Sequence, residues 1–130
     1  FPDHPNLLPA FFQADLDAAR RGDTTAFADA IAAAEPLLAR GHVVKPIFSR
    51  EGAGVVMVEN GRETARAPDD SYSHHPQIVQ ALAPLPEFDG FHPVLGAWIV
   101  GEDCVGLGLR EDRARITHDL SRFKPHFIEG

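Results

Sequence analysis

Cysteine, basic charge and long apolar runs are all scarce in this sequence. Cys104 is its single cysteine, which excludes an internal disulfide and fits a reducing, cytoplasmic location. No apolar run approaches the roughly 20 residues that span a bilayer, and no signal-peptide pattern stands at the start. With 12 Lys and Arg against 19 Asp and Glu, the net charge is −7. This balance argues against a general nucleic-acid surface, because phosphate backbones require clustered cations.

The length and composition are those of an ordinary globular domain. The chain has 130 residues, of which 44% are hydrophobic and 24% charged, enough for one compact domain. It starts without Met, inside a proline-rich stretch at 1–5, so we expect a piece of something longer. We expect one domain or fragment over 1–130, without repeats or low-complexity tracts.

The N-terminal part has helical periodicity. Residues 11–21 place Phe12 on the apolar side of a first helix, and Asp23 is suited to cap a second helix over 24–34. We interpret the whole helical region, 11–40, as packing and solvent-facing surface without chemistry.

From residue 42 to 130 the pattern is mostly that of strands and hairpins. Asn60-Gly61 is a strong hairpin signal, because both turn positions favour positive φ. The expected strands are a lysine-bearing one from residue 42, the two arms of this hairpin at 55–59 and 62–66, a strand at 77–83, and a second hairpin at 93–100 and 104–110. The predicted fold class is therefore α+β with a mainly antiparallel sheet.

Lys45 is the first candidate for ligand binding. Because it precedes Pro46, it is expected in a strand, where alternation places it on one face with Val43 and Ile47. A lysine between apolar residues is costly to bury without an anion, which favours a phosphate-bearing ligand. Gly52 and Gly54 would let the following loop turn its amides towards that anion. An ordinary hairpin with an edge lysine explains the same local pattern.

The return strand of the second hairpin is the second candidate. Gly106, Gly108 and Arg110 share one face, so bare backbone ending in a guanidinium would admit a flat or anionic ligand. Trp98 is expected in the core. His74 and His75 are expected on a solvated loop, pointing apart. No metal site is predicted from these residues.

Several ordered blocks of the sequence resemble the C-terminal end of the glutathionylspermidine synthase family. The resemblance covers most of the chain except about 13–40. It is carried by Phe1 to Ala10, Lys45-Pro46-Ile47 with Ser49-Arg50-Glu51-Gly52, Gln80 to Pro86, Gly96-Ala97-Trp98-Ile99, Gly106 to Asp112, Ile116-Thr117 and Ser121 to His126.

That resemblance implies an ATP-grasp fold and an ATP-dependent ligase. Such an enzyme joins a small-molecule carboxylate to an amine through an acyl phosphate, with ATP and Mg²⁺ as cofactors. The metal ligands of the family lie upstream of the matched region, so the remainder of the parent chain is an expected partner and this segment alone should be inactive. A non-catalytic nucleotide-binding or structural interaction domain is the alternative.

The resemblance also implies roles for individual residues. Lys45 would contact the ATP phosphates, and Arg110 would act in catalysis by neutralising a phosphate or the reacting carboxylate. The segment Gln80, Ala81, Leu82 and Ala83 would hold adenine. The flexible loop over the phosphates would comprise Ser49, Arg50, Glu51, Gly52 and Gly54. The nucleotide pocket would be lined by Arg115, Ile116 and Thr117.

Overall fold

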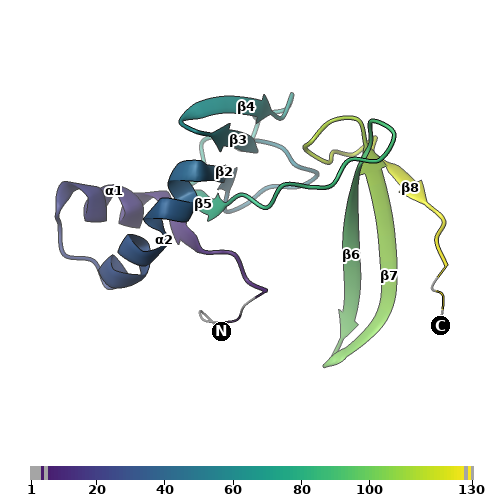
Figure 1. Cartoon of the computed structure of the whole chain (residues 1–130), viewed down its shortest axis with the longest axis horizontal. Helices are drawn as coiled ribbons and strands as arrows, with labels where there is room; N and C mark the ends of the chain where they lie inside the picture. The colour runs from purple at the N-terminus through teal and green to yellow at the C-terminus, as the bar shows by residue number, and fades with distance from the viewer. Residues whose placement is uncertain (1–3, 5, 128, 130) are drawn as a thin grey trace. The chain divides into compact units, whose positions relative to one another are not determined.

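The computed structural model describes residues 4, 6–127 and 129 (Figure 1). Most of the proline-rich stretch at 1–5 therefore lies outside the described residues. The chain divides into two compact units, Phe1–Ala83 and Pro84–Gly130, and each is described by itself. That 1–130 forms one domain stays a prediction. Two helices and mostly antiparallel strands confirm the α+β class.

The first unit contains an antiparallel sheet of five strands. Its strand order is β1-β5-β2-β3-β4 (Figure 1). The predicted lysine strand is β2, at the centre of this sheet, and the Asn60-Gly61 turn has positive φ at both residues, 50° and 73°. Both predictions are confirmed. The bounds are β1 (Ala10–Phe12), β2 (Gly41–Pro46), β3 (Val56–Glu59), β4 (Arg62–Arg66) and β5 (Gln77–Ala81).

Two helices precede β2, and both begin later than the sequence pattern predicts. Helix α1 spans Gln13–Arg21 and α2 spans Ala28–Arg40. The predicted start at residue 11 is wrong because Phe11 and Phe12 pair with β5, and Phe12 is half-exposed instead of lying on a buried stripe. Asp23 does not cap a helix. Its carboxylate instead accepts a hydrogen bond from Arg21 at 3.0 Å.

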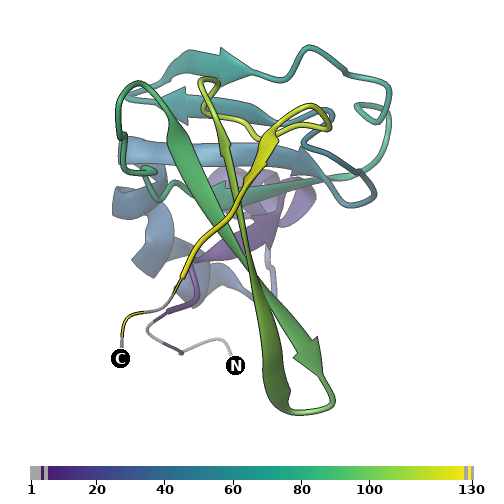
Figure 2. The same cartoon turned by 90° about the vertical axis from the view of Figure 1, so that its right-hand side faces the viewer.

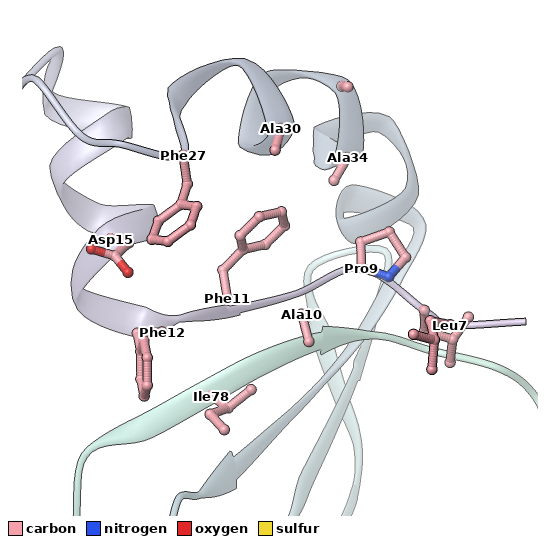
Figure 3. A pocket seen from close by; sticks show the side chains of 12 residues that line it. Leu7, Pro9, Ala10, Phe11, Phe12, Asp15, Phe27, Ala30, Ala34 and Ile78 are labelled. Carbon is pink, nitrogen blue, oxygen red and sulfur yellow. The ribbon is translucent and has the colours of Figure 1, made fainter. Parts of the chain in front are cut away.

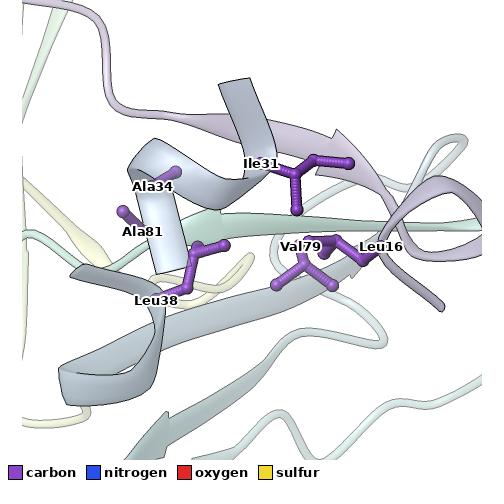
Figure 4. Packing of buried hydrophobic residues seen from close by; sticks show 6 residues of the cluster. All are labelled: Leu16, Ile31, Ala34, Leu38, Val79 and Ala81. Atoms are coloured by element: carbon purple, nitrogen blue, oxygen red, sulfur yellow. The ribbon is translucent and has the colours of Figure 1, made fainter. Parts of the chain in front are cut away.

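The core of this unit lies between the helices and one face of the sheet. Its buried side chains are Leu16, Ile31, Ala34, Leu38, Val79 and Ala81 (Figure 4). Because neighbouring residues of a strand face opposite ways, Val43, Lys45, Ile78 and Gln80 lie on the other face. We call this the helix-free face. Every described helix packs on the core side.

The second unit is built on a long hairpin. Strands β6 (His92–Val100) and β7 (Asp103–Asp112) pair antiparallel, and β8 (Arg122–Lys124) joins β7 (Figure 2). The prediction that Trp98 is buried is wrong, because its side chain is 69% exposed. A Cβ on Gly106 or Gly108 would stand within 3.8 Å of the indole. The glycine face is therefore covered by Trp98 and is not bare backbone.

None of the described helices is both long and apolar enough to cross a membrane.

Candidate functional site

Lys45 lies half-buried on the helix-free face. Its Nζ donates to Gln80 Oε1 at 2.7 Å, because β2 and β5 pair Val43 with Gln80 and so place the lysine diagonally beside the amide. No carboxylate partner exists for Lys45 within the described residues, whereas Arg20 and Arg66 each have one. A neutral acceptor orients the ammonium and leaves its charge available to an anion.

The loop after β2 forms a tight turn. Glu51, Gly52 and Gly54 have positive φ, and a Cβ on Gly54 would come within 2.7 Å of Pro46 Cγ. Ser49 Oγ donates to Ala53 O at 2.5 Å. Glycine is thus required at position 54 for both conformation and space.

Several amides of this loop are already engaged. The amides of Ala53, Gly54 and Val55 donate to backbone carbonyls at 2.7 to 3.2 Å. In the described part of the loop, the amides of residues 48–52 make no such bond. Any anion cradle formed here would therefore use amides from residues 48–52, among them those of 50–52 in the turn.

The end of β5 carries the segment that the sequence suggests for adenine. Ala81 is fully buried in the core, and its amide donates to Pro9 O at 2.9 Å. The amide of Leu82 donates to Gly41 O at 2.9 Å. Recognition of a base edge here would rely on the Ala83 amide and on backbone carbonyls.

An aromatic cluster that sequence reasoning missed lies beside the glycine loop. The ring of His75 is 5.6 Å from Phe48, 6.1 Å from Tyr72 and 4.2 Å from His74, measured between centroids. The expectation that the two histidines point apart is therefore wrong. Phe48 is far in the sequence from Tyr72, His74 and His75, so no local signal could have shown that it joins them. Among the described residues, no group of three or more His, Cys, Asp or Glu is arranged to hold a metal ion.

The structure also contains an apolar groove of about 630 Å³ in the first unit (Figure 3). Phe11 and Phe27 point into it from β1 and from the residue before α2, and Asp15 contributes a carboxylate at its border (Figure 3). The groove does not include Lys45 or the glycine loop. Sequence reasoning missed it because it assigned Phe11 to a helix.

In the second unit, Arg110 is held by neutral groups. Its Nη2 donates to the carbonyl of His118, and its guanidinium lies 5.2 Å from the centre of the Phe123 ring. Its Nε is buried without a partner among the described residues. The neighbouring Glu111 is instead neutralised by Arg122 at 2.7 Å and Lys124 at 3.3 Å. Within the described residues, the contacts of Arg110 are therefore with a carbonyl and an aromatic ring, and neither compensates its charge.

The loop 113–121 carries the remaining predicted residues. Ile116 is buried at 8% exposure, while Arg115 and Thr117 are partly exposed. Asp112 anchors the start of the loop by accepting hydrogen bonds from Ser121 Oγ at 2.6 Å and from the Ala114 amide at 2.9 Å. These two bonds lower the pKa of Asp112, and the bond from Ser121 has the larger effect.

The predicted site residues thus form two groups. Lys45, Gln80 and the loop 49–54 belong to the first unit, and Arg110 with the loop 113–121 belongs to the second. In the first group Lys45 contacts Gln80, and in the second Arg110 contacts His118 of the loop 113–121. That the two groups share one ligand stays a prediction.

Comparison with known proteins identifies the relatives of this chain. The model of the family described as glutathionylspermidine synthase preATP-grasp matches residues 1–129. A putative acid–amine ligase of Haemophilus influenzae is 36% identical over 98% of this chain and 29% of its own length. A trypanothione synthetase of Crithidia fasciculata is 28% identical over 89% of the chain and 15% of its own length.

A bifunctional glutathionylspermidine synthetase/amidase of Escherichia coli is 27% identical over 72% of the chain and 15% of its own length. The chain thus spans less than a third of each of these three relatives, and all of them are named as ligases or synthetases. The resemblance drawn from the ordered sequence blocks is confirmed: the chain belongs to the glutathionylspermidine synthase family.

Proposed function

We propose that this chain forms the ATP-binding, C-terminal portion of an ATP-dependent ligase that joins a carboxylate to an amine. The observation that carries the proposal is Lys45, a half-buried ammonium on the helix-free face whose one described partner is the neutral amide of Gln80. The names of the relatives support the reaction class. An ATP-grasp fold belongs to the same proposal.

The residues present fit a phosphate group better than they fit a metal ion. Lys45 offers a charged donor, and the amides of residues 50–52 lie in the turn that follows its strand. Mg²⁺ requires oxygen ligands in octahedral geometry, and the described residues contain no acidic cluster for it. We therefore assign Mg²⁺ binding to none of the described residues.

ATP would supply the phosphoryl group that turns the carboxylate into an acyl phosphate, which the amine then attacks with loss of phosphate. In this scheme Lys45 binds the phosphates, and Gln80 fixes the position of its ammonium. The loop 49–54 covers the bound phosphates and excludes water from them. Arg110 stabilises negative charge on the transferred phosphoryl group or on the reacting carboxylate.

The first experiment measures binding of ATP with Mg²⁺ to the full-length protein, in wild type and Lys45→Met. A hydrogen bond from a charged group contributes about 1.5–3 kcal/mol, so the affinity should fall about tenfold or more. Lys124→Met is the matched control, because that lysine is paired with Glu111. Unchanged affinity in Lys45→Met would remove this residue from the site.

The second experiment separates the ligase from the alternative, a non-catalytic nucleotide-binding or structural domain. ADP release is measured with glutathione and spermidine, the pair suggested by the name of the Escherichia coli relative. Hydroxylamine can replace the amine and trap any acyl phosphate. Release of ADP that depends on the carboxylate supports the ligase. Binding of ATP with no such release of ADP supports the alternative.

A further inference from the structure

We infer that Ser121, together with Asp112 and the backbone of His118, forms a latch that positions the guanidinium of Arg110 for the reaction. The inference rests on the proposed function, in which Arg110 stabilises developing negative charge. It assigns a positioning role to Ser121, a residue for which the sequence predicts no role. We call Asp112, His118 and Ser121 the Ser121 latch.

Ser121 makes three hydrogen bonds. They join the end of the loop 113–121 to His118 within the loop and to Asp112 just before it. Its amide donates to His118 O at 3.1 Å, and its hydroxyl accepts from the His118 amide at 2.9 Å. The same hydroxyl donates to Asp112 Oδ2 at 2.6 Å. Ser121 is also the one buried polar residue among those described, with 5% exposure. A buried hydroxyl that serves as donor and acceptor at once leaves the loop little freedom.

The latch connects directly to Arg110. The carbonyl of His118 that accepts from the Ser121 amide also accepts from Arg110 Nη2. Loosening Ser121 would therefore release the acceptor that orients the guanidinium. The guanidinium also contacts the ring of Phe123 in β8, which orients the group without neutralising it.

The latch also keeps a carboxylate away from Arg110. Asp112 lies two residues after Arg110 on the same face of β7, where it could pair with the guanidinium. Its oxygens are instead taken by Ser121, by the Ala114 amide and by His118 Nε2 at 3.2 Å. A guanidinium held by a carbonyl keeps its full charge for a substrate, whereas one paired with a carboxylate would have much of that charge compensated.

The experiment uses the full-length protein and the variant Ser121→Ala. We expect kcat for carboxylate- and amine-dependent ADP release to fall about tenfold, with the KM for ATP unchanged, because one orienting network is lost. In an Arg110→Ala background the same substitution should have no further effect on kcat. Equal losses in both backgrounds would overturn the inference, since a purely structural role does not depend on Arg110.

Thr25→Ala serves as the matched control, because it removes a hydroxyl that accepts one long bond, at 3.4 Å, in the first unit. Its kcat should equal that of wild type. Should Ser121→Ala fail to fold, as judged by circular dichroism, Asp112→Asn is measured in the same way.

A readout without catalysis separates this inference from the proposed function. Absence of ADP release by the wild type contradicts the proposed function, and the latch is then tested through the Nε–H signal of Arg110 in ¹⁵N-labelled protein. We expect a dispersed signal in wild type and in Thr25→Ala, and a shift towards the position of free arginine in Ser121→Ala. A signal that does not move in Ser121→Ala would overturn the latch.

Discussion

The two units of the chain are held together by different kinds of interaction. In the first, two helices bury Leu16, Ile31 and Leu38 almost completely against the sheet. In the second, the described residues that are buried are Ile116 and the polar Ser121. Apolar burial therefore stabilises the first unit, whereas hydrogen bonds, ion pairs and cation–π contacts order the base of the second.

The hairpin of the second unit makes the contrast plain. Large apolar side chains along β6 and β7 are exposed, and a two-stranded ribbon is marginally stable by itself. At the base of the hairpin, polar groups replace apolar packing, and Arg113 and Arg122 both stack on the ring of Phe91. The exposed side chains of these strands are Leu95, Trp98, Ile99, Val100, Val105 and Leu107.

The largest expected effect tests apolar burial in the first unit. Leu38→Ala removes a side chain that is 1% exposed, so the free energy of unfolding should fall by about 2–5 kcal/mol. Urea unfolding, monitored through hydrogen exchange of the β2 and β5 amides, measures this loss. Leu95→Ala, at a residue that is 68% exposed, should change stability by less than about 0.5 kcal/mol. Equal losses in the two variants would contradict the comparison.

The next effect concerns the glycine loop. Gly54→Ala combines a φ of 72° with a Cβ only 2.7 Å from Pro46 Cγ, so we expect a loss of about 1–3 kcal/mol in unfolding free energy. Gly61→Ala shares the positive φ but meets nothing within 4 Å. It should cost about 1 kcal/mol. Equal midpoints for the two variants in urea would show that the contact with Pro46 is relieved without cost.

Local signals in the sequence explain which parts of the fold were predictable. The Asn60-Gly61 hairpin and the strand of Lys45 were predicted correctly, because their turn and proline constraints act between neighbours in the chain. Strand β1 was not predicted, since Phe11 and Phe12 are extended only through pairing with β5. Before the late start of α2, the hydroxyl and carbonyl of Thr25 accept hydrogen bonds from the amides of Phe27 and Ala28, and such local bonds compete with a helix.

The candidate site shows the same division. The resemblance to the family located Lys45 and Arg110, but their partners Gln80 and His118 lie on other segments, and no local pattern joins them. Trp98 was misplaced because an apolar residue in a strand is usually buried. Which face of a ribbon is covered depends on elements that periodicity alone does not reveal.

The third prediction uses the pKa of Asp112, which Ser121 and then the Ala114 amide lower. A carboxyl with a lowered folded-state pKa stabilises the protein above its unfolded pKa of about 3.9, and that contribution disappears as the pH falls through the folded-state pKa. Asp112→Asn should therefore cost about 1 kcal/mol at pH 8. The difference from wild type should shrink below about pH 4.

Urea midpoints of both proteins between pH 2 and pH 8 measure this effect. Asp103→Asn, in the same hairpin but outside the latch, should give the wild-type profile. A difference that stays constant down to the lowest pH would mean that the carboxylate charge of Asp112 does not contribute to the latch.

The smallest expected effect is that of the exposed ion pair joining the two helices of the first unit. Arg20 Nε lies 2.8 Å from Glu35 Oε1, with side chains 48% and 35% exposed, and Arg20 lowers the pKa of Glu35. Because solvent screens such pairs, a double-mutant cycle with Arg20→Met and Glu35→Gln should give about 0.2–1 kcal/mol. That coupling should shrink in 1 M NaCl.

In the second unit, the cycle on Arg122 and Glu111 should give a larger coupling, because Glu111 is only 15% exposed and contacts a second cation, Lys124. Equal couplings in the two units would mean that polar contacts are no more important in the second unit than in the first.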